Sequence, residues 1–198
     1  MTNKKNNKFI KFFLPLFLGL FSSFSLPPYN FFLINFLTFP LLFNLITNKK
    51  ASINLFFVGW LFGFGYFLSS LYWIANSLTF DENLKVFIPI GLILVPSFLA
   101  VFYGLITLLI SFFNLKNNFS SILIFAAIFS FIEFLRGHML GGFPWNLISY
   151  SWSEFTNFIQ IISIIGTYSF NLLSITLFLL PIIYLFKNNL KKKLFYSL

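Results

Sequence analysis

Long apolar runs separated by short lysine clusters dominate this chain of 198 residues. A helix that crosses a bilayer needs about 20 mostly apolar residues, within a range of roughly 17–25. With 59% hydrophobic and only 9% charged residues, the chain has too little polar surface for a water-soluble domain. We predict an all-α integral membrane protein, a single domain formed by a bundle of about six transmembrane helices. The predicted spans are 9–26, 31–46, 53–75, 86–113, 120–135 and 166–186.

The positions of the basic residues predict how these helices are oriented. Cytoplasmic loops of membrane proteins carry an excess of Lys and Arg. If the N-terminus is cytoplasmic, all but Lys85 and Arg136 of the 13 basic residues fall on the cytoplasmic side. The pattern favours cytoplasmic N- and C-termini. It also identifies the formal net charge of +9 as a topology signal, so we expect no nucleic-acid partner.

Prolines and glycines refine this arrangement. Pro27-Pro28 separates the first two runs and predicts a tight hairpin. Gly59 and Gly63 have the four-residue spacing that lets helix backbones approach closely in lipid. Two prolines inside the fourth run predict a kinked or tilted helix.

Few residues in this composition can support chemistry. The chain has no cysteine, which excludes disulfides, thiolate metal sites and a cysteine nucleophile. His138 is the only histidine, which excludes a multi-histidine metal site, and no spacing ties it to a hydroxyl nucleophile. No GxSxG, Walker or dinucleotide-binding motif is present. We predict no metal, no cofactor and no catalytic residue in this chain.

One polar segment follows the fifth run, a periplasmic loop at about 136–157. Glu133 and Arg136 are three residues apart, so on a helix they share a face and can pair near the membrane boundary. Such a pair could anchor the helix end, or it could contact a substrate.

The loop itself combines flexible glycines with a proline and an interfacial tryptophan. This combination is typical of an ordinary loop tip, and equally of a loop that dips into lipid and shapes the access of an acyl chain. The candidate substrate-binding or loop-shaping residues are Glu133, Arg136, Gly142, Phe143, Pro144 and Trp145.

Taken together, the motifs of this chain resemble those of the bacterial apolipoprotein N-acyltransferases. Segments 133–137, 142–145 and 149–151 resemble the E-x-x-R-G, G-F-P-W and G-Y-S-like segments of that family. Similar stretches occur upstream and downstream, at 27–29, 59–67, 71–74 and 164–170. The resemblance covers nearly the whole chain, in order.

The resemblance implies a specific reaction. Members of the family transfer an acyl chain from a membrane phospholipid to the amino group of the N-terminal diacylglyceryl-cysteine of a lipoprotein. A Glu–Lys–Cys triad on a periplasmic nitrilase-like domain carries the reaction through a thioester on the cysteine. The implied partners are therefore phospholipid and lipoprotein, and the implied location is the bacterial cytoplasmic (inner) membrane.

The chain departs from the family pattern where catalysis is concerned. It has no cysteine, and Leu194–Leu198 resembles the start of a seventh span. No triad residue can be carried over, so we expect this polypeptide to be inactive alone. A fragment is the favoured explanation. A split gene with a separately encoded nitrilase-like domain and a free-standing membrane protein are the alternatives.

Two other functional classes are a small transporter and a lipid-binding scaffold. A transporter usually carries ionisable residues or broken helices near the bilayer midplane. Glu133 is the only acidic residue within a predicted span, and it lies near the outer end. The prolines of the fourth run are the best support for a transporter.

Overall fold

The computed structural model describes residues 2–47, 53–139 and 141–195, and side chains within 13–47, 53–139 and 141–183. In these ranges every regular element is a helix. The longer helices are α1 (Thr2–Ser23), α2 (Asn35–Thr47), α3 (Ile53–Ser70), α4 (Ile88–Ile110), α5 (Phe119–His138) and α8 (Thr167–Phe195). The shorter ones are the 3-10 helices η1 (Phe32–Ile34), η2 (Tyr72–Thr79), η3 (Glu82–Phe87) and η4 (Ile148–Trp152), with α6 (Thr156–Ile159) and α7 (Ile162–Ile165).

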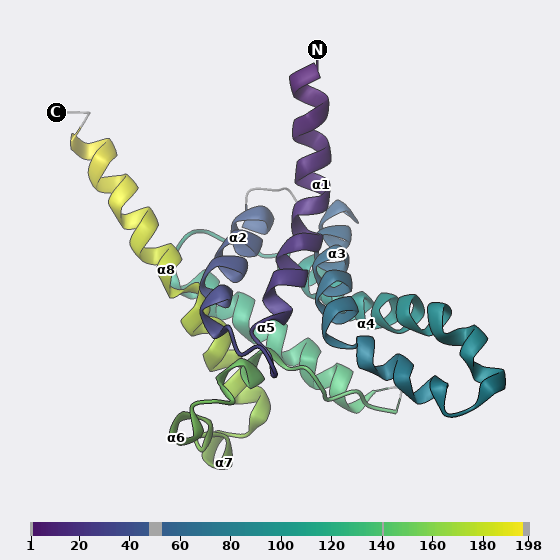
Figure 1. The fold of residues 1–198 in the computed structure, drawn as a ribbon. Coiled ribbons are helices and arrows are strands. Elements are labelled where there is room, and N and C mark those ends of the chain that lie inside the picture. The colour runs from purple at the N-terminus through teal and green to yellow at the C-terminus, as the bar shows by residue number, and fades with distance from the viewer. Residues whose placement is uncertain (1, 48–52, 140, 196–198) are drawn as a thin grey trace.

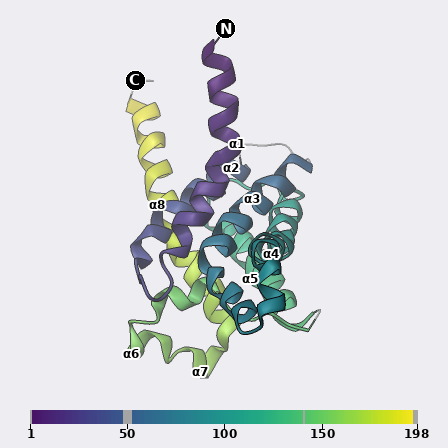
Figure 2. The same cartoon turned by 45° about the vertical axis from the view of Figure 1, so that its right-hand side comes forward.

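The start of α1 and the end of α8 lie at the same end of the molecule, and α6 and α7 lie at the opposite end (Figures 1 and 2). This arrangement is the one required if both termini face the same side of a membrane. We call the end that carries α6 and α7 the outer end, following the orientation predicted from the lysines. The orientation itself stays a prediction.

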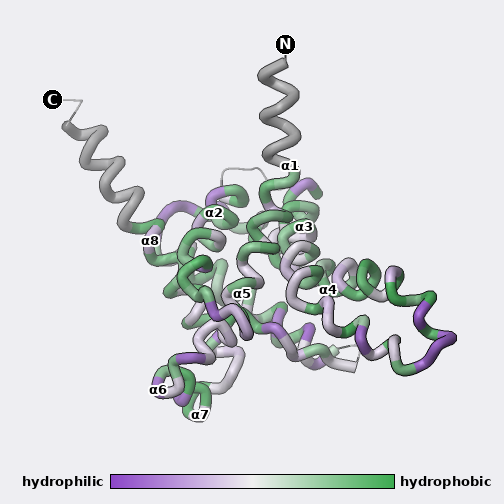
Figure 3. The backbone as a smooth tube through the Cα atoms, viewed as in Figure 1, coloured by the Kyte–Doolittle hydropathy of each residue, from purple (hydrophilic) through white to green (hydrophobic). Residues whose placement is uncertain are grey.

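Among the described residues, three helical segments are long and apolar enough to cross a membrane, namely Ile53–Ser70, Glu82–Ile110 and Phe119–His138. Shorter apolar helical stretches cover Phe13–Ser23, Phe32–Thr47 and Thr167–Ile183. Apolar residues dominate the helices, whereas hydrophilic residues gather at the turn between η2 and η3 and in segments at the outer end (Figure 3). The chain is an all-α membrane protein, as predicted, while the number of six spans stays a prediction.

Helix bounds differ from the predicted third and fourth spans. Helix α3 ends at Ser70, and η2 and η3 occupy most of the chain between it and α4. These 3-10 helices and the beginning of α4 project sideways from the body of the molecule (Figure 1). Helix η3 starts at a polar cap, where the Asp81 side chain accepts a hydrogen bond from the backbone N–H of Asn83. Such local side-chain bonds compete with a continuous helix.

The last two predicted spans are longer as helices. Helix α5 continues to His138, so Arg136 lies on its last turn instead of in the loop. Helix α8 continues to Phe195, past the predicted end at 186 and across the last lysine cluster. A lysine cluster ends a hydrophobic run but does not break a helix, because lysine is a good helix former.

Helix α3 packs against α4 through small residues. A Cβ atom added to Gly59 would lie 2.2 Å from the carbonyl oxygen of Tyr103, and one added to Gly63 would lie 2.7 Å from the Cβ of Tyr103. The hydroxyl of Thr107 donates to the carbonyl of Leu55 across the same interface, at 2.6 Å. The close approach predicted from the glycine spacing is confirmed.

The opposite side of α3 meets α1 in the same way. A Cβ atom on Gly19 would lie 1.8 Å from the carbonyl oxygen of Phe62, and one on Gly65 would lie 2.2 Å from that of Leu16. We call Gly19, Gly59, Gly63 and Gly65 the glycine seam. Because the glycine seam leaves no room between the three backbones, it fixes the position of α3 between α1 and α4.

Candidate functional site

Helix α5 carries the predicted ion pair into the protein interior. Nη2 of Arg136 donates to Oε2 of Glu133 at 2.6 Å, and both side chains are completely buried. The guanidinium group also lies over the ring of Phe67, 5.2 Å from its centroid. A buried charge is tolerated only where it is paired and hydrogen-bonded. The spacing of three residues therefore predicted the pair correctly, but it did not show that the pair is buried.

Arg136 also holds the loop that follows its helix. Nη1 donates to the carbonyl oxygen of Phe143 at 2.7 Å, and Nη2 donates to that of Trp145 at 3.1 Å. The backbone adds a bond from the N–H of Phe143 to the carbonyl of Arg136, at 3.0 Å. We call residues 141–147 the clamped loop. Its carbonyl groups lack helical partners, and buried carbonyls need donors, which one guanidinium group supplies here.

The sharp course of the clamped loop depends on residues with positive φ. Gly141 and Gly142 adopt φ values of 89° and 72°, which favour glycine. A Cβ atom on Gly142 would lie 2.6 Å from the carbonyl oxygen of Gly137, so a larger residue would push the loop off the end of α5. Gly142 therefore determines the course of the loop, whereas access of an acyl chain along the loop stays a prediction.

Asn146 links the clamped loop to α3, and it was not among the predicted site residues. Its carbonyl oxygen accepts a hydrogen bond from the hydroxyl of Tyr66 at 3.0 Å. Its side-chain Nδ2 donates to the carbonyl of Ser70, the last residue of α3, at 3.2 Å. Asn146 adopts φ 56°, a conformation in which asparagine is enriched. Its position directly after Trp145 is the sequence feature that could have identified it as a site residue.

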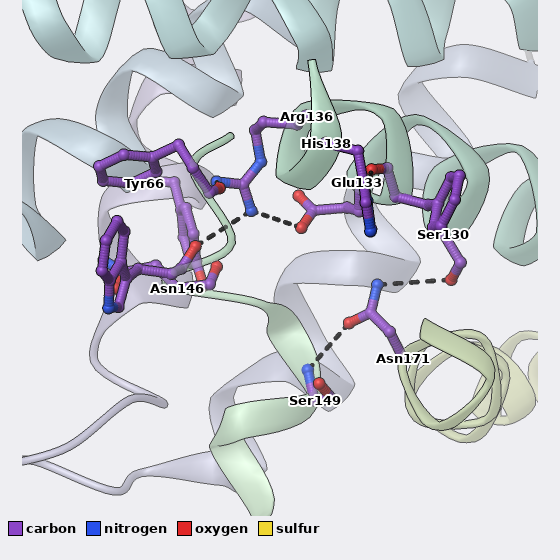
Figure 4. A network of polar contacts seen from close by, with 11 residues as sticks. Tyr66, Ser130, Glu133, Arg136, His138, Asn146, Ser149 and Asn171 are labelled. Atoms are coloured by element: carbon purple, nitrogen blue, oxygen red, sulfur yellow. Dashed lines mark hydrogen bonds and ion pairs between the residues drawn. The ribbon is translucent and has the colours of Figure 1, made fainter. Parts of the chain in front are cut away.

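A second polar connection lies beside the first (Figure 4). The backbone N–H of Ser149 donates to Oδ1 of Asn171 at 2.9 Å, and Nδ2 of Asn171 reaches the hydroxyl of Ser130 at 3.4 Å. All three residues are buried. The connection joins η4, α8 and α5, so the outer segment is tied to two long helices as well as to Arg136.

Of the remaining predicted residues, Phe143 is partly buried and packs against the hydrophobic core, whereas Pro144 and Trp145 are exposed. Trp145 is 54% exposed, and its ring lies against Phe143 with the ring centroids 5.1 Å apart. Pro144 continues the loop towards Trp145 without regular structure. All six predicted candidates thus belong to one assembly, in which Glu133 and Arg136 are the buried base and Trp145 is the exposed tip.

His138 takes no part in this assembly. Its side chain is exposed, and Nδ1 lies 2.8 Å from the carbonyl oxygen of Phe134 on its own helix. No hydroxyl forms a hydrogen bond with His138 among the side chains that the structure describes. The same part of the chain contains no group of three His, Cys, Asp or Glu residues that could hold a metal ion.

Several buried polar atoms beneath the loop have no hydrogen-bond partner among the described residues. They include Oε1 of Glu133, Nε of Arg136 and the hydroxyl of Tyr103. These buried polar groups lie among apolar helices. Ionisable groups inside a membrane protein are costly and tend to be functional.

The fold and the site together define a helical membrane protein that uses a buried ion pair to hold an irregular loop at one end of its bundle. Residues 18–180 match the family described as the apolipoprotein N-acyltransferase N-terminal domain. The chain belongs to this family, as the motifs predicted.

Individual relatives support the same assignment. The chain is 36% identical over 176 residues to an apolipoprotein N-acyltransferase of Rhizobium etli, covering 84% of this chain and 33% of the relative. It is 34% identical over 172 residues to one of Rhodopseudomonas palustris, covering 84% and 32%. For one of Brucella melitensis the identity is 33% over 173 residues, covering 82% and 32%. The chain spans about a third of the length of these relatives.

Proposed function

We propose that this chain is the membrane domain of an apolipoprotein N-acyltransferase and contributes to lipoprotein maturation in the bacterial inner membrane. The reaction would move an acyl chain from a phospholipid to the N-terminal diacylglyceryl-cysteine of a lipoprotein. The observation that carries the proposal is the convergence of the family-like motif residues. Glu133 and Arg136 are charged and buried, whereas Trp145 is aromatic and exposed. Hydrogen bonds nevertheless join the three residues into one structure at the outer end.

In this proposal the chain positions substrate or lipid and does not itself catalyse the acyl transfer. Arg136 and Glu133 hold the clamped loop, and Trp145 meets substrate or lipid at the outer end. The thioester chemistry of the resemblance needs a cysteine, and this sequence contains none. The catalytic triad must then come from a nitrilase-like domain, either in a longer form of this polypeptide or in a separate chain. We therefore expect the 198-residue chain alone to be inactive.

A chimera tests the proposal. This chain would replace the matching third of the Rhizobium etli relative, and N-acylation of a lipoprotein would be followed by mass spectrometry in cells depleted of their own enzyme. The chimera should restore N-acylation, and the 198-residue chain alone should not. Arg136→Ala should lower the chimera's activity by about tenfold or more, since each 1.4 kcal/mol of lost positioning corresponds to a factor of ten.

Lys85→Ala is the matched control, because it removes a basic residue from an exposed ion pair away from the loop. It should leave N-acylation unchanged. A stably inserted chimera that transfers no acyl chain would overturn the proposal, as would a chimera in which Arg136→Ala and Lys85→Ala have equal activity.

A further inference from the structure

A cavity of about 350 Å³ lies at the outer end of the bundle, beside the clamped loop. Three segments form its walls: the hairpin turn between α1 and η1, the end of α3 with the start of η2, and the clamped loop with η4. We call it the outer pocket. Its lining includes Tyr29, Ser70, Trp73, Trp145, Tyr150 and Ser153.

The outer pocket is mostly apolar, and none of the side chains that line it is charged. Serine and tyrosine hydroxyls and one side-chain amide supply its polar groups, and no Lys, Arg, Asp or Glu is among the lining residues. The cations on this side are engaged elsewhere, since Arg136 bonds to Glu133 and to loop carbonyls, and Lys85 pairs with Glu82. Proteins hold phosphate groups with Arg, Lys or helix N-termini. The outer pocket therefore suits an uncharged ligand that accepts hydrogen bonds.

Ser70 is among the lining residues and carries an unused donor within the pocket wall. Its Oγ is buried and has no hydrogen-bond partner among the described residues. Its backbone carbonyl has a structural task instead, since it accepts bonds from Nδ2 of Asn146 and Nε1 of Trp73. A buried hydroxyl without a partner calls for an explanation, and a ligand carbonyl is one. Burial raises the pKa of the Tyr150 hydroxyl, so this group stays a neutral donor as well.

Aromatic rings surround the opening. Tyr29, Trp73 and Trp145 are each about half exposed, at 50%, 48% and 54%. Tyr and Trp favour the membrane–water interface, where an apolar ring face meets a polar edge. A ligand held here would thus have its polar part at interface depth, with room for apolar chains to continue into lipid.

We propose that the outer pocket binds the diacylglyceryl ester region of a lipid, with an ester carbonyl accepting a hydrogen bond from Ser70. This region is uncharged, carries ester carbonyls and joins two acyl chains. The choice of ligand rests on the proposed function, in which the phospholipid donor and the diacylglyceryl-cysteine acceptor share this region and differ in almost everything else. One pocket that recognises the shared part serves both substrates in turn, whatever their head groups.

Photolabelling of the 198-residue chain in lipid nanodiscs tests this proposal without requiring catalysis. Three probes carry the same diazirine on an acyl or alkyl chain: a phosphatidylethanolamine, an N-acetyl S-diacylglyceryl-cysteine amide, and a long-chain alkyl phosphate without glyceryl esters. The readout is the yield of label on peptides that line the outer pocket. The two diacylglyceryl probes should agree within about threefold, and the alkyl phosphate should label about tenfold less, a difference of 1.4 kcal/mol.

Ser70→Ala removes the donor and leaves the backbone bonds of Ser70 in place. It should lower the pocket label from both diacylglyceryl probes about fivefold, the effect of one hydrogen bond. Ser77→Ala is the matched control, because the exposed Ser77 hydroxyl bonds only to its own 3-10 helix. Ser153→Leu adds bulk on another wall of the outer pocket and should lower the label independently of Ser70.

Each outcome decides the matter. Equal labelling by the alkyl phosphate, or a tenfold preference for the phosphatidylethanolamine over the thioether probe, would overturn the proposal because a phosphate would then be recognised. Unchanged pocket label in either Ser70→Ala or Ser153→Leu would also overturn it. Failure of the proposed function gives a different result. The chimera would then be inactive, although its membrane domain would still take up both diacylglyceryl probes.

Discussion

Helix α3 meets two kinds of neighbour, and the two contacts are built by opposite means. Along its middle, the glycine seam brings α1 and α4 so close that added Cβ atoms would lie 1.8–2.7 Å from neighbouring atoms. At its outer end, α3 contacts the clamped loop through hydrogen bonds from Tyr66 and to Ser70. The first contact depends on shape, and the second depends on donors and acceptors.

The difference follows from the backbone. A helix satisfies its own N–H and C=O groups, so two helices can pack by close approach alone. The clamped loop has no such internal pairing, so those of its carbonyls that are shielded from water must find donors within the protein. Arg136 supplies these donors, and Glu133 balances the charge of Arg136. The buried ion pair is thus a consequence of placing an irregular loop against a membrane bundle.

The largest effect on stability should come from removing Arg136. Arg136→Ala leaves the Glu133 carboxylate buried without its partner, and loss of one member of a buried pair costs about 3–5 kcal/mol. The free energy of unfolding would be measured by denaturing detergent titration in mixed micelles. Lys85→Ala, which breaks an exposed pair, should cost less than about 1 kcal/mol. Similar losses of free energy of unfolding in the two variants would show that the charge of Arg136 is not needed to hold the clamped loop.

The glycine seam should be nearly as sensitive, for a steric reason. Gly19→Ala places a Cβ atom 1.8 Å from a backbone oxygen of Phe62, which cannot rotate away. We expect a loss of up to about 3 kcal/mol, the upper range for an overpacked core. Gly91→Ala is the control, since its nearest neighbour is a Leu78 methyl carbon 3.4 Å away, and it should stabilise α4 by up to about 1 kcal/mol. Equal effects in the same titration would contradict the seam.

A smaller effect is expected at the left-handed residue of the clamped loop. Asn146→Ala forces alanine to adopt φ 56° and removes the bond to Ser70, at a cost of about 1–2 kcal/mol from the backbone conformation. Asn146→Gly keeps the conformation accessible and loses only the side-chain bond, so it should cost less. If the alanine variant unfolds no more easily than the glycine variant, the left-handed backbone conformation at position 146 does not determine stability.

The smallest effect should come from Tyr66→Phe. It removes one hydrogen bond to the carbonyl of Asn146 and leaves the buried ring in place, so we expect a loss of about 0.5–1.5 kcal/mol. Tyr72→Phe alters a half-exposed tyrosine outside the loop contacts and should be silent. A loss in Tyr66→Phe as large as that in Arg136→Ala would mean that the tyrosine is the main support of the loop.

Much of this account was available from the sequence. The apolar runs predicted the helices, the spacing of Gly59 and Gly63 predicted the close packing, and the three-residue spacing predicted the Glu133–Arg136 pair. These features follow from local periodicity, which a single chain displays directly. The motifs around Trp145 also predicted the family correctly.

The rest depends on contacts between distant segments. Nothing local shows that Arg136 bonds to loop carbonyls, that Asn146 reaches the end of α3, or that Asn171 bridges Ser130 and Ser149. Single polar residues in apolar runs look alike until the fold brings them together. The 3-10 helices that follow α3 were missed for a related reason, because apolar composition alone does not distinguish an α-helix from a tighter one.

The central claim is that the buried ion pair exists to hold the clamped loop and not to stabilise the bundle. The double variant Glu133→Leu with Arg136→Met tests it most directly, because replacing both members of a buried pair by apolar residues is often neutral for stability. Hydrogen–deuterium exchange would be followed at 141–147 and along α3 and α5. The account predicts unchanged protection in the helices and exchange about tenfold faster in the loop, a loss of about 1.4 kcal/mol of local stability. Equal protection of the loop in both proteins would contradict the account.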